Sequence, residues 1–432
     1  MRSKRSMKSI MSTTTQWPSS MPVLSILEPT DYQFKFVGEG AANYVFEVVV
    51  PPSNELSNLF KSHLLRVPKA GTKAHSYVEL HEHWQTVVSP LFEPQDLVDQ
   101  RLIQLNDGEE LAARLNAVLE DEEHARRADF KGGRVAVAEY GMLVEDMRQK
   151  RPDDLAFEFK PKWLSQSPSA PPTATRCRNC AREPIKIAKL LKHNPKFTST
   201  TTITTIPSSP SPTSSSSSLS SIDPPTSPSS SSNNPSASFL CPFNFLTCPH
   251  SPTALQNILT HFATALQPPI SPATCSPSQY ARLTHWFQTN TLLPRLRDAQ
   301  VAHDRTGPLG TDPSQDHRNG DFHNGEADQE IGGKEGKQPN DTGKGKGKEE
   351  DLPLAMTLRD CACFVRIPAD ETLPLEAKLA DLDKKNRTAK LKYWRATEQM
   401  LIDGGYYEGK GAGVGGVEVD CQLDVDCQLD NI

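Results

Sequence analysis

Long apolar runs are missing from this sequence. No stretch of about 18 consecutive apolar residues occurs, so we expect no membrane-spanning helix and no membrane partner. The N-terminal segment MRSKRSMKSIMSTTTQWP is basic but has no continuous apolar run, so we expect no secretory signal; a mitochondrial presequence is the alternative. The nine cysteines are an odd number, which without an export signal favours free thiols in a reducing compartment, the nucleus or the cytoplasm.

Apolar residues are also scarce overall. They make up 36% of the chain, against roughly 45–50% in typical globular proteins. Much of the deficit lies in two very polar stretches, 197–238 and 304–350, which have too little apolar content to fold and are predicted to be disordered inserts. About 300 residues remain without these inserts and the polar termini, enough for one large lobed domain or two intimate ones.

A strong excess of positive charge is absent too. The formal net charge is −6, so an anionic ligand must be met by a local basic cluster. The basic residues are not interleaved with aromatic residues, so we expect no direct nucleic-acid binding. The P-loop pattern GxxxxGK[ST] and the HRD and DFG signatures of protein kinases do not occur, which argues against both classes.

Residue patterning predicts an N-terminal group of strands with two helices. Residues 32–50 alternate apolar and polar side chains around a glycine-containing turn, which predicts a β-hairpin. Further strands are predicted at 63–69, 132–147 and 155–164, and helices at 75–93 and 108–128. This order matches a kinase-like amino-terminal lobe, although order alone does not establish a function.

The rest of the chain is predicted to be mixed. Helices are expected at 185–195, 253–267, 278–302 and 385–403. Strands are expected within 352–367, in MTLRDCACFVRI at 356–367, and at 375–383. The tail ends in a direct repeat, DCQLD at 420–424 and again at 426–430. Two copies of five residues do not make a repeat architecture, and we assign them no function.

Three features of the N-terminal group could bind a nucleotide. The turn GEGAAN at 38–43 places glycines between two strands, where backbone amides can approach phosphates; an ordinary hairpin turn is the alternative. Arg66 on the third strand could reach nucleotide phosphates or be a surface charge on an edge strand. The strand end LVEDM at 143–147 could be an adenine hinge or simply an acidic strand end.

The segment EFKPKW at 158–163 is more informative. A period of two places Glu158, Lys160 and Lys162 on one face, and Pro161 fixes the backbone between the lysines. Two lysines on one face repel each other unless an anion lies between them, and a polyphosphate would satisfy that requirement. A solvated edge strand is the alternative. A second basic cluster, 384–392, would by itself be interpreted as a solvated helix.

With these motifs in order, the chain resembles the inositol-pentakisphosphate 2-kinase family, and its fungal branch in particular. GEGAAN is similar to the glycine-rich loop of that family, and Glu158–Lys162 matches its ExKPK motif in full. MTLRDC at 356–361 resembles its (K/R)DC motif, ADLDKK at 380–385 its D-L-x-x-K motif, and KWLSQSPSAPPTATRCRNCARE the fungal sequences. The resemblance covers about 30–195, 239–300 and 352–403.

The resemblance implies an α+β, two-lobed, kinase-like fold. The N-lobe, 30–164, would have an antiparallel sheet and bind the nucleotide. The larger, mixed α/β C-lobe, 165–403, would bind the inositide and be interrupted by the two disordered inserts. Residues 1–29 would be a disordered N-terminus and 404–432 a flexible tail. We expect a monomer.

The resemblance also implies an activity. The family uses ATP and Mg²⁺ to phosphorylate the 2-hydroxyl of inositol 1,3,4,5,6-pentakisphosphate, giving inositol hexakisphosphate (phytate), and it suggests a nuclear location. The alternative is a non-catalytic scaffold that binds inositol polyphosphates with a kinase-like fold. The presence of both Asp360 and Asp381 argues against the scaffold, because a decayed kinase usually loses its metal-binding or basic carboxylate.

Residue roles follow from the matched motifs. For the nucleotide they are Gly38, Gly40 and Asn43 in the phosphate-covering loop, Arg66 at the phosphates, and Glu145, Asp146 and Met147 in the hinge. Lys160 would face the reacting phosphates and Asp360 would orient or deprotonate the hydroxyl. The predicted metal ligands are Asp381 and Asp360, and the predicted inositide contacts are Lys162, Arg127 or its neighbour Arg126, Arg178, Lys385 and Tyr393.

The cysteines suggest one further site. Cys177 and Cys180 form a CxxC pair, which with Cys241 and with Cys248 or His250 could bind zinc. Zinc ligands of some relatives lie in a different stretch, and a CxxC without a clean second pair is weak evidence. We therefore expect no structural zinc.

Overall fold

The computed structural model describes residues 23–24, 32–52, 57–193, 239–266, 269–310, 351–410 and 421–423. The chain divides into two compact units. The N-unit is residues 1–148 with 378–386, and the C-unit is residues 149–377 with 387–432. The first boundary therefore follows Arg148, whereas the lobe boundary was predicted after Leu164. The insert predicted at 197–238, most of 1–29, and residues 311–350 of the second insert lie outside the described residues.

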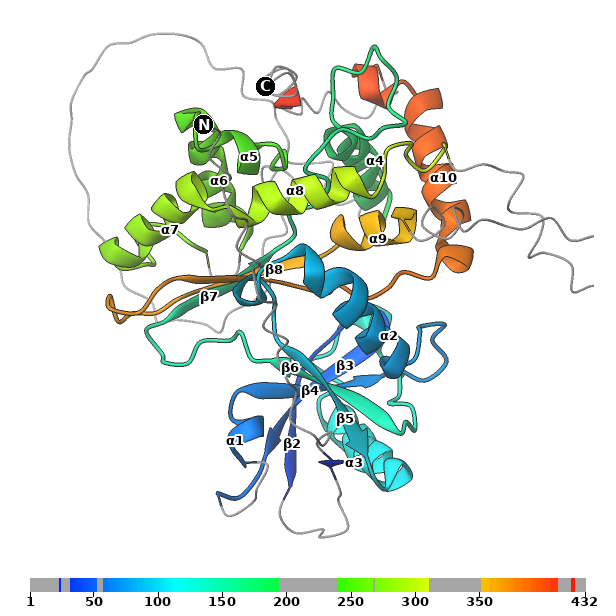
Figure 1. The fold of residues 1–432 in the computed structure, drawn as a ribbon, viewed down its shortest axis with the longest axis vertical. Coiled ribbons are helices and arrows are strands. Elements are labelled where there is room, and N and C mark those ends of the chain that lie inside the picture. Colours follow the sequence, from blue (N-terminus) through cyan, green and yellow to red (C-terminus); the bar gives the residue numbers. More distant parts are fainter. Residues whose placement is uncertain are drawn as a thin grey trace, which may run out of the picture. The chain divides into compact units, whose positions relative to one another are not determined.

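The N-unit contains a six-stranded sheet in the order β1-β5-β6-β4-β3-β2 (Figure 1). Its strands are β1 Val23–Leu24, β2 Gln33–Glu39, β3 Asn43–Val49, β4 His63–Pro68, β5 Gln100–Leu105 and β6 Tyr140–Glu145. The predicted hairpin is confirmed as β2–β3, with Phe36 opposite Phe46. The sheet is antiparallel as predicted except at one edge, where β1 pairs with β5 in parallel.

Helices pack on this sheet and bury its core. They are α1 Ser57–Phe60, α2 Tyr77–His83, continued by a π-turn at Trp84–Val88, and α3 Gly108–Asp121. Leu111, Leu115 and Leu119 recur every four residues on one face of α3, so they meet Phe46 and Leu65 of the sheet in one buried cluster. This packing fixes the strands that carry the predicted nucleotide residues.

The C-unit is mostly helical. Its helices are α4 Arg178–His193, α5 Asn244–Thr247, α6 Pro252–Ala265, α7 Pro277–Thr289, α8 Leu292–Ala302, α9 Asp351–Leu358 and α10 Arg387–Asp403. A small sheet has the order β7-β8-β9, with β7 Leu155–Phe159, β8 Ala362–Ile367 and β9 Glu376–Ala380, the last of which crosses the boundary between the units. Helices α5 to α9 gather on one side of β7 and β8 (Figure 1). The mixed α+β class is therefore confirmed.

Aromatic side chains anchor β7 in the C-unit. Phe159, the last residue of β7, has its ring centroid 5.0 Å from Phe245, 5.4 Å from Phe262 and 6.1 Å from Phe287. These rings come from α5, α6 and α7, so a single residue ties the strand to three helices. Because Lys160 follows Phe159 directly, this cluster positions the start of the two-lysine segment.

Several element predictions were wrong in detail. The strand predicted from MTLRDCACFVRI at 356–367 starts inside helix α9, and only β8 is a strand, because the apolar residues at the end of α9 fit a buried helix as well as a strand. The helix predicted at 278–302 is two helices, separated at Asn290, whose side chain accepts a hydrogen bond from the Leu293 N–H at 3.0 Å. Strand β5 was not predicted, because its polar residues Gln100, Arg101 and Gln104 interrupt the alternation of apolar and polar residues that is typical of a strand.

Two segments assigned to disordered or flexible regions are packed. Asp304, at the start of the second predicted insert, is buried and pairs with Arg359. Tyr407, in the predicted flexible tail, is fully buried in a 3₁₀ turn at Tyr406–Glu408. Within the described ranges, no helix has the length and apolarity that crossing a membrane requires.

Candidate active-site residues in each unit

The glycine-rich turn joins β2 to β3 in the N-unit. The Gly40 N–H donates to the Asn43 carbonyl at 2.9 Å, which closes the turn. A Cβ built on Gly38 or Gly40 would have no described atom within 4 Å. The glycines are therefore not required by packing within the unit, and the open space beside them leaves room for a ligand.

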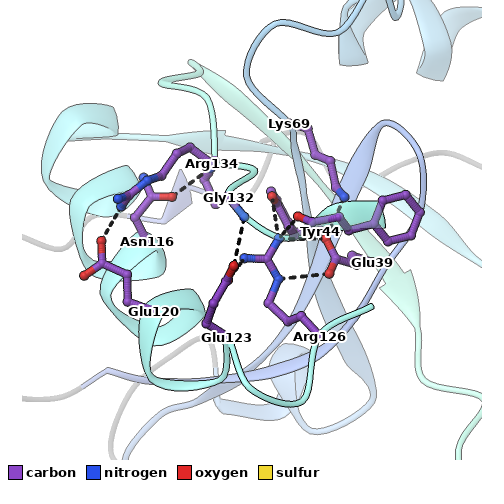
Figure 2. Close-up of polar contacts among 11 residues, drawn as sticks. Glu39, Tyr44, Lys69, Asn116, Glu120, Glu123, Arg126, Gly132 and Arg134 are labelled. Carbon is purple, nitrogen blue, oxygen red and sulfur yellow. Dashed lines mark hydrogen bonds and ion pairs between the residues drawn. The ribbon is translucent and has the colours of Figure 1, made fainter. Parts of the chain in front are cut away.

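Buried charges hold the base of this turn (Figure 2). Glu39 accepts from Lys69 Nζ at 2.6 Å and from Arg126 Nε at 2.9 Å, and the three side chains are at most 8% exposed. Arg126 Nη2 also donates to the Tyr44 hydroxyl at 3.2 Å. Burial raises the pKa of Glu39. Hydrogen bonds and charge from Arg126 and Lys69 together lower it by a larger amount, so the net shift of the pKa is downward.

The two neighbouring arginines proposed as inositide contacts differ in position. The Arg126 side chain is 2% exposed and forms an ion pair with Glu39. The Arg127 side chain is 70% exposed and lies 3.4 Å from Asp129. Of this pair, the structure therefore presents only Arg127 to a solvent-borne ligand.

Arg66 on β4 lies in a polar cluster with residues from the 378–386 segment. It donates to both carboxylate oxygens of Asp383, with Nη1 3.1 Å from Oδ1. The Asn43 amide meets its neighbours best with Oδ1 toward Arg66, 2.6 Å from Nη2, and Nδ2 toward the Tyr77 hydroxyl. Burial lowers the pKa of Arg66 and the Asp383 carboxylate raises it, and the raising effect prevails. Asp383 was not among the predicted site residues.

The 378–386 segment packs on the rest of the N-unit. Lys378 Nζ lies 2.7 Å from Glu145 Oε2, and the Val98 N–H donates to the Leu379 carbonyl at 2.9 Å. Asp381 has a φ of 57°, a left-handed conformation that is rare for a residue other than glycine and that needs support from its surroundings. The Asp381 charge contributes to the raised pKa of Arg66, so the two groups are near each other. Lys385 lies in the same segment and is partly exposed.

The predicted hinge follows β6. The Glu145 N–H donates to the Asp99 carbonyl at 2.8 Å, and the Asp146 N–H donates to the Ser62 carbonyl at 2.9 Å. Both amides are thus engaged within the N-unit. Met147 follows them and is buried.

The two lysines of the ExKPK motif meet at one aspartate in the C-unit. Lys160 Nζ donates to the Asp360 carbonyl at 3.1 Å, and Lys162 Nζ lies 3.5 Å from Asp360 Oδ1. They do not share a strand face with Glu158, as was predicted, because β7 ends at Phe159 and Lys162 has a φ of 63°. A change of backbone direction, rather than strand alternation, brings the lysines together.

Gln300 on α8 fixes this arrangement and was missed by sequence reasoning. Its Nε2 donates to the Lys162 carbonyl at 2.9 Å and to the Leu358 carbonyl at 3.1 Å, and its Oε1 accepts from the Leu164 N–H at 2.9 Å. The side chain is fully buried. It therefore joins the two-lysine segment to the end of α9, two residues before Asp360. Nothing in the sequence of α8 indicates that this glutamine binds backbone groups of distant segments.

Lys162 has an altered ionisation. Burial lowers the pKa of Lys162, the Asp360 carboxylate raises it, and the charges of Lys160 and Lys186 lower it, with a net downward shift. Lys186 belongs to α4, so a third cation acts on this site. The concentration of positive charge at Lys162 is the electrostatic feature that an anionic ligand would relieve.

Arg178 and Tyr393 take different positions. Arg178 is 4% exposed, its Nε donates to Glu398 Oε2 at 2.6 Å, and its guanidinium lies 4.2 Å from the Trp163 ring centroid. The Tyr393 side chain is exposed, and its hydroxyl accepts from Arg182 Nη2 at 2.6 Å. Arg178 therefore packs in the interior, whereas Tyr393 is exposed and Arg182 is partly exposed.

Four cysteines also gather in the C-unit. The Sγ atoms of Cys177, Cys180, Cys241 and Cys421 lie within 4.8 Å of one another. The predicted pairing of the CxxC with Cys248 was wrong, because Cys248 Sγ donates to the Phe287 carbonyl at 3.0 Å, and burial raises the pKa of Cys248 to about 12. Of the residues that the structure describes, these four cysteines form the one cluster of three or more metal-ligand side chains.

Comparison with known proteins agrees with the motifs. The profile of the family described as inositol-pentakisphosphate 2-kinase matches residues 36–400. The chain is also similar to a protein of Yarrowia lipolytica (strain CLIB 122 / E 150) named inositol-pentakisphosphate 2-kinase, with 40% identity over 57 residues. That alignment spans 13% of this chain and 18% of the relative. Because the family profile covers most of the sequence, the chain belongs to the inositol-pentakisphosphate 2-kinase family.

Proposed function

We propose that this protein transfers the γ-phosphoryl group of ATP to the 2-hydroxyl of inositol 1,3,4,5,6-pentakisphosphate, giving the hexakisphosphate. The observation that carries the proposal is the convergence of Lys160 and Lys162 on Asp360. Phosphoryl transfer needs charge neutralisation and positioning more than covalent help from the protein. Two ammonium groups beside one carboxylate provide both cations for phosphate oxygens and a proton acceptor for a hydroxyl.

Asp360 is the proposed acceptor of the hydroxyl proton. Its side chain is 51% exposed, so a substrate can reach it, and the Lys162 ammonium lies 3.5 Å from its Oδ1. Lys160 donates to the backbone carbonyl of Asp360, and Lys162 lies beside its carboxylate. Lys160 would stabilise charge on the transferred phosphoryl group.

The N-unit residues are proposed to hold ATP. The Gly38–Gly40 turn would cover the phosphates, since the space beside both glycines is open. Arg66 would approach the phosphates from β4, with Asn43 and Asp383 setting the direction of its guanidinium. In the hinge, the Met147 N–H would donate to the adenine ring, because the Glu145 and Asp146 amides are already bonded to backbone carbonyls.

Magnesium is expected from the chemistry of kinases, and the donor types fit. Mg²⁺ binds through one or two carboxylates together with waters and substrate phosphates. Asp381 of the N-unit is exposed and the Asp360 side chain of the C-unit is half-exposed, so each carboxylate is open to such an ion. When bound, the ion would neutralise phosphate charge. We propose Asp381 as the main ligand, because a left-handed aspartate held beside Arg66 indicates a functional constraint.

The inositide would be bound by a set of basic residues in each unit. The chain has a net charge of −6, so recognition of a polyphosphate depends on such a set. In the C-unit the proposed contacts are Lys162 and Tyr393, joined by Arg182, which donates to Tyr393, and by Lys186, whose charge acts on Lys162. In the N-unit the proposed contacts are Lys385 and Arg127. Arg178 is proposed as a positioning residue instead, because its guanidinium is engaged by Glu398.

A kinase assay tests the proposal against the scaffold alternative. Full-length protein is incubated with labelled ATP, Mg²⁺ and the pentakisphosphate, and transfer is compared for wild type, Asp360→Asn and Lys160→Ala. Loss of a positioned base typically lowers kcat about 10²–10⁴-fold, and we expect that for Asp360→Asn. Asp370→Asn, on an exposed loop, is the control and should keep full activity. Pentakisphosphate binding without turnover by wild type would favour the scaffold, and absence of both would refute the proposal.

A further inference from the structure

The four clustered cysteines come from distant parts of the sequence. Cys177 and Cys180 flank the start of α4, Cys241 precedes α5, and Cys421 comes from the tail. Three of them are fully or almost fully buried, at 0%, 0% and 1% exposure. Burial of individual thiols does not explain why four sulfur atoms from three segments lie within 4.8 Å of one another, so the arrangement needs a physical cause.

The spacing of the sulfurs fits a single tetrahedral metal ion. Cys177 Sγ lies 3.4 Å from Cys180 Sγ and 3.9 Å from Cys241 Sγ. A disulfide would bring two sulfurs to about 2.05 Å. Four thiolates at about 2.3 Å from a central Zn²⁺ are separated by about 3.8 Å along each tetrahedral edge. The observed separations are therefore those of ligands around one ion.

The surroundings also suit a metal-bound thiolate group. The Cys177 N–H donates to Cys421 Sγ at 3.1 Å, and the Cys180 N–H donates to Cys177 Sγ at 3.5 Å. Such bonds stabilise negative charge on sulfur. Phe243 and Leu423 pack on the cluster and keep it dry. Without a cation, these four adjacent thiols, three of them buried, have few partners other than one another.

We propose that Cys177, Cys180, Cys241 and Cys421 bind one structural Zn²⁺ ion. Four sulfur ligands leave no open coordination position, which is typical of structural rather than catalytic zinc. A cluster of several irons would need its cysteines farther apart, because iron and sulfide fill the space between them. The site corrects our expectation of no zinc, and it is independent of the proposed kinase activity.

The ion would cross-link three chain segments. It fixes the start of α4, the helix that carries Arg182 and Lys186, and it retains the tail at residues 421–423. Closing long loops through a metal stabilises the folded state at the expense of the unfolded chain. The site also gives one copy of the DCQLD repeat a role, because Cys421 lies in the first copy.

The repeat supplies a matched control for the experiment. Cys427 has the same local sequence as Cys421, and it lies outside the described residues. Full-length wild type, Cys180→Ser, Cys421→Ser, Cys427→Ser and the Cys421→Ser/Cys427→Ser double variant are purified under reducing conditions. Zinc and iron are counted by mass spectrometry, and Co²⁺ is titrated into metal-free protein while thiolate-to-cobalt absorption is followed.

We expect wild type and Cys427→Ser to carry one zinc per chain and to give the spectrum of tetrahedral cobalt with four sulfurs. Cys180→Ser and the double variant should bind Co²⁺ at least tenfold more weakly, since loss of even an outer partner costs about 10–100-fold. Retention by Cys421→Ser with loss only in the double variant would mean that Cys427 can replace Cys421, and would still support the site.

Three results would overturn the proposal. The first is wild type that binds neither Zn²⁺ nor Co²⁺ with its thiols reduced. The second is wild type that carries iron in place of zinc. The third is metal loss from Cys427→Ser together with metal retention by Cys421→Ser. If Cys180→Ser does not fold, a chelator added to wild type decides instead: it should lower the thermal midpoint, and an unchanged midpoint after zinc removal would contradict a structural role.

Discussion

Asp360 is contacted by the ammonium groups of Lys160 and Lys162, which belong to one short segment. Phe159 is fixed by aromatic packing, Lys162 is held in a left-handed conformation, and Gln300 binds the Lys162 carbonyl. Positive φ at a residue other than glycine costs energy and persists where function or surroundings demand it. Lys162 therefore points at Asp360 because the backbone is forced to turn there.

The lowered pKa of Lys162 predicts a pH effect on substrate binding. A lysine with a lowered pKa loses its proton at a lower pH than an ordinary lysine, so affinity for the inositide should fall early as pH rises. Lys162→Arg keeps its charge at every accessible pH, and we expect it to move the alkaline limb of kcat/KM to higher pH. The exposed Lys35→Arg is the control and should leave the limb in place. An identical alkaline limb in wild type and Lys162→Arg would contradict this assignment.

Substitution of Arg178 tests whether this residue stabilises the interior of the C-unit or contacts the substrate. Arg178→Met leaves the fully buried carboxylate of Glu398 without its guanidinium partner, so we expect a loss of about 3–5 kcal/mol in unfolding free energy. Arg182→Met changes a partly exposed residue of the same helix and should cost less than about 1 kcal/mol. Denaturant titration measures both. Unchanged stability with a raised KM for the inositide would restore Arg178 as a substrate contact.

At the scale of elements, the β2–β3 hairpin is held by its own buried ion cluster. Glu39→Gln leaves Lys69 and Arg126 buried without their shared carboxylate, so we expect a loss of about 3–5 kcal/mol in unfolding free energy and weaker ATP binding. Glu120→Gln breaks an exposed pair with Arg134 in the same region and should cost at most about 1 kcal/mol (Figure 2). Equal stability losses in the two variants would show that the cluster does not support the hairpin.

The same cluster predicts acid lability. Glu39 has a lowered pKa in the folded protein and an ordinary value near 4.5 when unfolded. Its contribution is therefore complete above pH 4.5 and is lost as pH falls below that value toward the folded pKa. The stability difference between wild type and Glu39→Gln should narrow as pH is lowered from 5 to 3, measured by denaturant titration at each pH. A constant difference over this range would exclude the charge as its cause.

The elements also show what local patterns can predict. The hairpin follows from its alternation and turn residues, and α3 and α10 follow from helical periodicity, because one face of each helix is buried and the other is exposed. Strand β4 follows from its apolar residues, since it is largely buried on both faces. Helix α9 does not, since it is apolar on all sides and a buried strand has the same composition. The role of Gln300 was equally hidden, because its three hydrogen bonds are to backbone groups distant in sequence.

At the scale of the whole molecule, packing between distant segments decides what sequence patterns leave open. The 378–386 segment belongs to the N-unit although it lies beyond most of the C-unit in sequence, and it brings Asp383 to Arg66. Asp304 and Tyr407 are ordered because Arg359 and Glu398 bind them. The motifs identified the family and most candidate residues, but no local pattern predicted that Cys421, rather than Cys248, completes the cysteine cluster.

Identification of the reaction product tests the central claim most directly. Full-length protein is given ATP, Mg²⁺ and inositol 1,3,4,5,6-pentakisphosphate, and the inositide is analysed by anion-exchange chromatography and phosphorus NMR. We predict inositol hexakisphosphate, with the new phosphate on the 2-hydroxyl, from wild type and Asp370→Asn, and almost none from Asp360→Asn. Unchanged pentakisphosphate with wild type, or equal product from Asp360→Asn, would contradict the assignment of this site.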